Sequence, residues 1–161
     1  MKQSQITANR YHDISVGHRV VGHEGKCRFL HGHNYRIHFE VAADDSADPL
    51  DDVGRVLDFG VIKSHLCMFL ENEWDHKFLA WEDDPLVNRM FAAIAYTEDD
   101  RESDYFRNSV VFVPFNPTAE NMAQYLVEVV APLRLMGTGC TLIKVVVEET
   151  RKCSCTYTKG D

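Results

Sequence analysis

The chain lacks the features that mark membrane-spanning and secreted proteins. No stretch of its 161 residues approaches the roughly 18 apolar residues that a transmembrane helix needs. The opening segment, MKQSQITANRYHD, has no apolar core of the kind found in signal peptides. We therefore expect a cytoplasmic protein with no membrane partner.

Positive charge and paired cysteine motifs are also scarce. Lysine and arginine number 17 against 25 aspartate and glutamate residues, so the formal net charge is −8. This balance disfavours general binding to nucleic acid. The five cysteines are an odd number and include no C-x-x-C pair, which makes reduced thiols the expected state. The length predicts a single domain, 1–161.

The most informative motif is the run CRFLHGHNY, which begins at Cys27. His31 and His33 are two positions apart in a strand-like segment, so both side chains project from the same face. His18, on a neighbouring segment, would add a third imidazole. Three protein ligands with one open position are typical of a catalytic zinc centre. The thiol of Cys27, close to such a centre, is a candidate base or nucleophile.

Periodicity predicts an α+β fold with helices on one face of an antiparallel sheet. The acidic segment 44–55 is expected to be a loop and 97–108 an exposed polar excursion. The remaining segments read as strands at 11–19, 31–43, 109–115, 141–149 and 153–158, and as helices at 59–74, from Pro85, and at 117–133.

Two further motifs contain side chains that could act in catalysis or binding. In the adjacent pair Asp75-His76 the carboxylate can orient the imidazole, although a histidine at a helix end is also favoured by the helix dipole. Glu149 lies at the end of the run VVVEET, where it can equally be an ordinary polar strand terminus.

Together these motifs resemble the 6-pyruvoyl-tetrahydropterin synthase / 6-carboxytetrahydropterin synthase family, and they occur in the same order. The resemblance implies the tunnelling fold, with a four-stranded antiparallel sheet per subunit. It also implies a homo-oligomer, a hexamer of paired trimers in which the sheets join into a barrel. The long segment at about 85–108 departs from compact members and is expected to be an insert.

The resemblance assigns roles to particular residues. It implies zinc on His18, His31 and His33, and a catalytic triad of Cys27, Asp75 and His76 that is assembled across a subunit interface. It implies that Glu149 grips the pterin ring, with Thr118 and Glu120 of the motif PTAE nearby. Trp74 replaces the leucine that usually precedes the Asp-His pair. His12 and His23 match no family ligand and are expected at the surface.

The short spacing Cys-x3-His-Gly-His is similar to that of bacterial 6-carboxytetrahydropterin synthases of queuosine (7-deazaguanine) synthesis. It implies a lyase that converts 7,8-dihydroneopterin triphosphate to 6-carboxy-5,6,7,8-tetrahydropterin, acetaldehyde and triphosphate. For the anionic substrate we expect a local basic pocket drawn from six residues: Arg19, Lys26, Arg28, Arg151, Lys152 and Lys159.

Three alternatives remain open. The first is a 6-pyruvoyl-tetrahydropterin synthase, which acts on the same substrate without cleaving a carbon–carbon bond. The second is a non-catalytic metal-binding or scaffold protein in which Cys27 is a bystander. The third is a cupin-like metal protein, but cupins place a glutamate four or five residues past the second histidine, where this chain has Ile37 and His38.

Overall fold

The computed structural model describes residues 5–45, 48–95 and 100–160. Its centre is a long antiparallel pair, β1 (Ala8–His18) and β2 (His31–Ala43), in which Ala8 faces Val41 and His18 faces His31. Alternate residues of both strands are buried. Since successive strand side chains point to opposite faces, the pair has one apolar face and one polar face.

The sheet has six strands in the described part of the chain, not the four expected, in the order β4-β3-β1-β2-β5-β6. The strands β5 (Cys140–Thr150) and β6 (Cys153–Thr158) extend it antiparallel from β2. On the other side β3 (Lys77–Trp81) and β4 (Val110–Val113) pair in parallel, so the sheet is mixed. The sequence did not reveal β3 because it follows a helix directly and is too short to show alternation.

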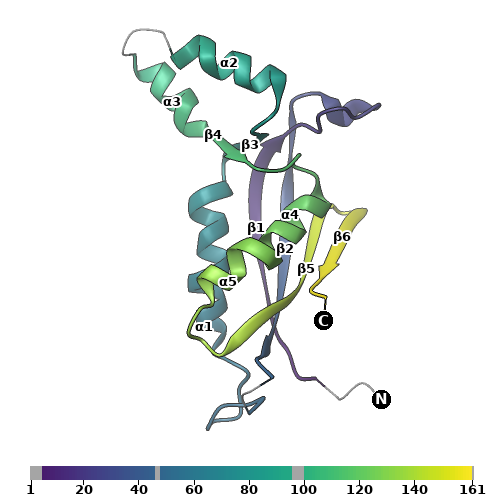
Figure 1. Cartoon of the computed structure of the whole chain (residues 1–161), viewed down its shortest axis with the longest axis vertical. Coiled ribbons are helices and arrows are strands. Elements are labelled where there is room, and N and C mark those ends of the chain that lie inside the picture. Colours follow the sequence, from purple (N-terminus) through teal and green to yellow (C-terminus); the bar gives the residue numbers. More distant parts are fainter. Residues whose placement is uncertain (1–4, 46–47, 96–99, 161) are drawn as a thin grey trace.

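Two helical segments cover the apolar face of the sheet (Figure 1). The first comprises α1 (Phe59–Ile62), η2 (Lys63–Cys67) and η3 (Leu70–Trp74), and Asp58 caps it by accepting the amide of Gly60 at 2.7 Å. The second comprises α4 (Ala119–Tyr125), η4 (Leu126–Val130) and α5 (Ala131–Arg134). Both occupy the spans that the sequence pattern predicts.

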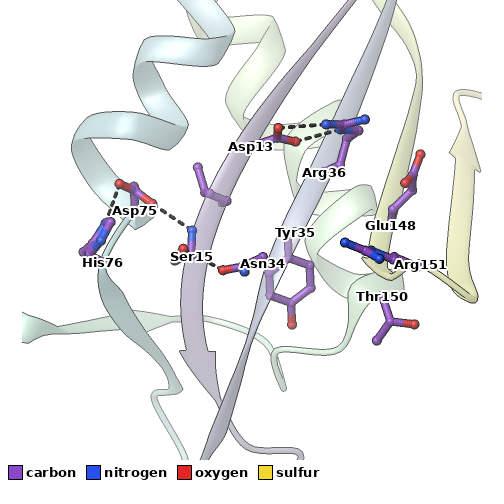
Figure 2. Close-up of a pocket in the computed structure, with 11 residues that line it drawn as sticks. Asp13, Ser15, Asn34, Tyr35, Arg36, Asp75, His76, Glu148, Thr150 and Arg151 are labelled. Atoms are coloured by element: carbon purple, nitrogen blue, oxygen red, sulfur yellow. Dashed lines mark hydrogen bonds and ion pairs between the residues drawn. The ribbon is translucent and has the colours of Figure 1, made fainter.

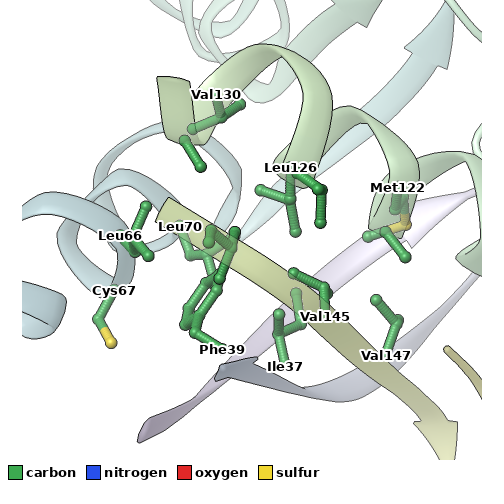
Figure 3. Packing of buried hydrophobic residues seen from close by; sticks show 14 of the residues in the cluster. Ile37, Phe39, Leu66, Cys67, Leu70, Met122, Leu126, Val130, Val145 and Val147 are labelled. Carbon is green, nitrogen blue, oxygen red and sulfur yellow. The ribbon is translucent and has the colours of Figure 1, made fainter. Parts of the chain in front are cut away.

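The hydrophobic core lies between these helices and the sheet (Figure 3). Ile37 and Phe39 of β2 and Val145 of β5 are fully buried beneath Leu70 and Leu126. A fully buried side chain of this size stabilises the fold by about 1.5–3 kcal/mol through removal of apolar surface from water. The core therefore fixes β1 and β2, the strands that carry the histidines.

The expected insert forms two helices, α2 (Pro85–Ala95) and α3 (Arg101–Ser109), that lie beyond one end of the sheet (Figure 1). The segment 97–108, expected to be an exposed polar excursion, is a mostly exposed helix from Arg101 onward, and residues 97–99 lie outside the described residues. Asp100 caps α3 by accepting the amide of Ser103 at 2.9 Å. The aromatic rings of Phe91, Phe106 and Phe112 pack together, which offsets the polar composition of α3.

Across the described residues, no helix is both long and apolar enough to cross a membrane.

Candidate functional site

The register of β1 and β2 brings His18, His31 and His33 together at one end of the apolar face. His18 pairs directly with His31, and Val16 pairs with His33. One ring nitrogen from each of the three lies within 4.8 Å of the others. This confirms the expectation that the strand positions of these residues gather three imidazoles around one point.

Two of the rings are oriented by backbone carbonyl groups. Nδ1–H of His18 donates to the carbonyl oxygen of Pro117 at 2.6 Å, and Nδ1–H of His31 donates to that of Phe29 at 2.7 Å. A carbonyl oxygen only accepts, so each ring carries a proton on Nδ1, and in the neutral ring Nε2 is the nitrogen left free to bind a metal. This is the usual outer-shell arrangement of metal-binding histidines.

His33 supplies the observation that tests whether a metal fits. Its Nε2 atom is buried and has no hydrogen-bond partner among the described residues. The Oε1 atom of Glu149 is 3.5 Å away, too far for a good hydrogen bond. A buried nitrogen without a partner is costly. The orphaned nitrogen and the two oriented rings match the donor set of a three-histidine zinc site.

The electrostatics of the cluster favour neutral rings. Burial lowers the pKa of His18, and His31 lowers it further, against an opposing effect from the Pro117 carbonyl. Burial also lowers the pKa of His33, which the Glu149 charge partly offsets. Since a metal binds only neutral imidazole, the lowered pKa values favour the metal-binding form of His18 and His33.

Cys27 lies in a short 3-10 turn, Lys26–Arg28, just before β2. Its carbonyl oxygen accepts the amide of Val20 at 2.8 Å, and the residue is half-buried. Burial, the charge of Glu149 and the charge of Cys27 all raise the pKa of Tyr35, whose hydroxyl is 3.2 Å from Nε2 of His18. The Glu149 carboxylate therefore contributes to the electrostatics around the histidine cluster.

The strand β5 directs its two consecutive glutamates to opposite faces. Glu149 follows the buried Val145 and Val147 in alternation and points to the histidine cluster. Glu148 points to the polar face, where it pairs with His38 at 2.5 Å. A β-bulge in the pairing between β5 and β6 occurs at this point. The geometry thus distinguishes Glu149 from its neighbour as the carboxylate beside the histidines.

Asp75 and His76 form a hydrogen-bonded pair at the edge of β1 (Figure 2). Oδ2 of Asp75 accepts from Nδ1 of His76 at 2.6 Å, and Oδ1 accepts the amide of Ser15 at 2.8 Å. His76 has a φ of 56°, a left-handed conformation that is unfavourable for a residue other than glycine. Its amide donates to the carbonyl oxygen of Ser15 at 2.8 Å, which helps to hold that conformation.

The side chain of His76 is 81% exposed and opens into a groove of about 540 Å³ on the polar face of the sheet (Figure 2). Asn34 and Arg36 of β2 and Arg151 also line this groove. The side chains of the histidine cluster project from the other face of the same strands, although His33 and His76 both line a shallow hollow of about 420 Å³. Among the described residues, no hydrogen bond or ion pair links His76 to Cys27 or to the cluster.

The motif PTAE has a structural role at the start of α4. The hydroxyl of Thr118 accepts the amide of Asn121 at 3.2 Å as the helix cap. Glu120 is exposed in the first turn. Burial, the charge of Glu120 and then that of Glu149 raise the pKa of Cys155 to about 11. The helix α4 lies on the apolar face of the sheet, the face to which Glu149 also points. Sequence reasoning missed the Pro117 carbonyl because a backbone group leaves no signal in residue type.

The basic residues that were expected near the anionic substrate lie in different parts of the structure. Nε of Arg19 pairs with Asp84 at 2.7 Å, and its Nη1 atom donates to the carbonyl oxygen of Arg28 at 3.2 Å. Nη1 of Arg28 donates to the carbonyl oxygen of Glu24 at 2.8 Å. Arg151 lines the groove of His76, whereas Lys159 lines a separate hollow beside α5. The guanidinium of Arg19 therefore contacts other groups of the fold in this structure.

Comparison with known proteins identifies the family. The profile described as "6-pyruvoyl tetrahydropterin synthase" matches residues 7–160. The chain belongs to this family. A 6-carboxy-5,6,7,8-tetrahydropterin synthase from Rickettsia typhi is 29% identical over 148 residues, covering 92% of this chain and 96% of that protein. The protein of the same name from Bacillus subtilis is 28% identical over 151 residues, covering 92% and 82%.

Solved structures show the same fold. An uncharacterized protein from Wolinella succinogenes superposes with a TM-score of 0.82 at 22% identity, covering 98% of this chain and 100% of that one. The 6-pyruvoyl tetrahydropterin synthase of Caenorhabditis elegans gives a TM-score of 0.62 at 22% identity, with 99% of each chain covered. The expected tunnelling fold of the α+β class is therefore confirmed, apart from the number of strands.

Proposed function

We propose that this chain is a zinc-dependent lyase that converts 7,8-dihydroneopterin triphosphate to 6-carboxy-5,6,7,8-tetrahydropterin, acetaldehyde and triphosphate in queuosine biosynthesis. The observation that carries the proposal is the buried, unpartnered Nε2 of His33 beside two histidines whose Nδ1 atoms are held by carbonyl groups. The names of the curated relatives support the choice of product.

Substrate binding in this proposal rests on Glu149. A carboxylate can accept two N–H groups from the 2-amino-4-oxo edge of a pterin, which is a bidentate match. Glu149 lies 3.5 Å from His33, so a ring held there would place its side chain over the three histidines. Thr118 and Glu120 are proposed to border this pocket. When bound to His18, His31 and His33, zinc supplies Lewis acidity that polarises the hydroxyl groups of the substrate side chain.

Proton transfer is assigned to Cys27 and His76. The thiolate of Cys27 removes and returns protons at the side-chain carbons, and His76 is the partner acid and base. Asp75 keeps Nδ1 of His76 protonated, which leaves Nε2 free to exchange a proton with substrate. Because no hydrogen bond or ion pair in the described part of the chain links His76 to Cys27 or to the cluster, we propose that each site combines Cys27 of one copy with His76 of a second copy.

The assembly that this requires is proposed to be a homohexamer of paired trimers. Both edges of the described sheet, β4 and β6, have unpaired backbone groups that a neighbouring copy can cover. The spacing of Cys27 from His31 favours the 6-carboxy product over 6-pyruvoyl-tetrahydropterin. Acetaldehyde separates the two, since it forms only when a carbon–carbon bond is cleaved.

The test is turnover by zinc-loaded protein, with triphosphate and acetaldehyde measured together. Wild type should release both in equal amounts. Cys27→Ala should keep its zinc and release neither, while Cys153→Ala, which changes an exposed thiol on β6, should behave as wild type. Triphosphate without acetaldehyde would indicate the 6-pyruvoyl activity. Absence of triphosphate from fully zinc-loaded wild type would refute the proposal and leave a metal-binding scaffold.

A further inference from the structure

Asn116 precedes the PTAE motif and makes a paired contact with the backbone of Val21. The amide of Val21 donates to Oδ1 of Asn116 at 2.9 Å, and Nδ2 of Asn116 donates to the carbonyl oxygen of Val21 at 2.8 Å. The side-chain amide thus satisfies one donor and one acceptor of the same residue, 95 positions away in the chain. Such a contact fixes both the position and the direction of the backbone at Val21.

Val21 belongs to the loop of residues 19–30 that separates His18 from His31 and contains Cys27. The amide of Val20 donates to the carbonyl oxygen of Cys27 at 2.8 Å, so the two ends of this loop are joined next to Val21. The other hydrogen bonds described within 20–27 stay inside the loop, as between Gly25 and His23. Among the described residues, the two hydrogen bonds between Val21 and Asn116 tie the middle of the loop to another element, whereas at its ends Arg19 pairs with Asp84 and Phe29 accepts from His31.

Asn116 is itself held firmly at the start of α4. Its carbonyl oxygen accepts the amide of Thr118 at 2.7 Å and Nδ2 of Asn121 at 2.9 Å. The next residue, Pro117, provides the carbonyl oxygen that orients His18. One short segment therefore contacts the backbone beside Cys27 through a side chain and a candidate zinc ligand through its main chain.

We propose that Asn116 is a positioning residue that fixes the loop of Cys27 relative to the histidine cluster. The consequence for catalysis rests on the function proposed above, whereas the effect on the loop does not. Removal of the side chain leaves the Pro117 carbonyl and the Thr118 cap in place, so the zinc ligands stay oriented. The loop keeps the contacts of its ends, where Arg19 pairs with Asp84 and Phe29 accepts from His31, but it loses both hydrogen bonds at Val21, so the thiol is held less closely in one position relative to the substrate carbons.

The experiment combines hydrogen exchange with steady-state kinetics on Asn116→Ala and Asn116→Asp. Asn116→Asp keeps the shape but replaces the donor to the Val21 carbonyl with an oxygen. The control is Asn88→Ala, because Nδ2 of Asn88 makes the same kind of bond, to the carbonyl oxygen of Glu82 at 2.7 Å, in the insert. Amide exchange in 20–28 should be about ten-fold faster or more in both Asn116 variants and unchanged in the control.

In turnover, both Asn116 variants should retain one zinc per chain, with kcat lowered about ten-fold or more and KM changed less than about three-fold. Unchanged exchange in 20–28 would overturn the proposal whatever the activity. Faster exchange with wild-type kcat would overturn it as well. If wild type is inactive on the pterin triphosphate but exchange in 20–28 still rises, the proposed function fails and the positioning role stands.

Discussion

Replacement of Asp75 by asparagine separates the orientation of His76 from the stability of the fold. Asp75 accepts hydrogen bonds from the Ser15 amide and from Nδ1 of His76, and its side chain is 17% exposed. Burial would raise the pKa of Asp75, but these hydrogen bonds outweigh it and hold the pKa below its ordinary value of 3.8. The carboxylate is therefore charged throughout the neutral range.

In Asp75→Asn the remaining carbonyl oxygen can still accept the Ser15 amide, and the NH2 group then faces Nδ1 of His76. The imidazole must present an unprotonated Nδ1 and move its proton to Nε2, the wrong tautomer for its proposed role. Exchange of a charged acceptor for a neutral one should cost about 1 kcal/mol of stability. Loss of the correct tautomer should lower kcat by about a thousand-fold.

The assay is triphosphate release at saturating substrate, together with urea unfolding and zinc content. Asp13→Asn is the matched control, because Asp13 lies two residues before Ser15 in the same groove and pairs with Arg36 at the surface. Asp75→Asn should retain zinc and fold, with kcat about a thousand-fold down, and the control should stay near wild type. A kcat for Asp75→Asn within about five-fold of wild type would refute the assignment of His76.

Two further predictions concern the surroundings of the histidine cluster. Arg19→Met should lower the free energy of unfolding in urea by about 3 kcal/mol, because it leaves the carboxylate of Asp84, which is 1% exposed, without its cation; a loss below about 1 kcal/mol would contradict this account. The lowered pKa of His18 contributes stability that is present above its ordinary pKa of 6.5 and is lost as the pH falls through the folded pKa. The free energy of unfolding of zinc-free protein in urea should therefore fall as the pH drops below 6.5, and it should fall less steeply with pH in His18→Gln. An unchanged pH dependence in that variant would show that another group causes the loss of stability.

The sequence predicts the histidine cluster well because it depends on local alternation. His31 and His33 share a face by strand geometry, and the pairing of β1 with β2 then places His18 opposite His31. The helices at 59–74 and 117–133 can be predicted equally well, because long apolar stripes and the caps Asp58 and Thr118 mark them.

The parts that escaped prediction depend on contacts between distant segments. The parallel pairing of β3 with β4 joins residues about thirty positions apart, and no local pattern encodes it. The helix α3 has a polar composition and becomes stable through its Asp100 cap and its packing on Phe91. The contact between Asn116 and Val21 also spans the chain, which is why the sequence did not distinguish Asn116 from an ordinary turn residue.

The most direct test of the account is complementation between two inactive variants. Cys27→Ala and His76→Ala should each assemble, bind zinc and fail to turn over the pterin triphosphate when prepared alone. In mixed oligomers formed from equal amounts of both, a site that takes Cys27 from one copy and His76 from another is intact in about one quarter of cases. We predict recovery of about a quarter of wild-type activity. Mixed oligomers that remain inactive would contradict a site shared between copies.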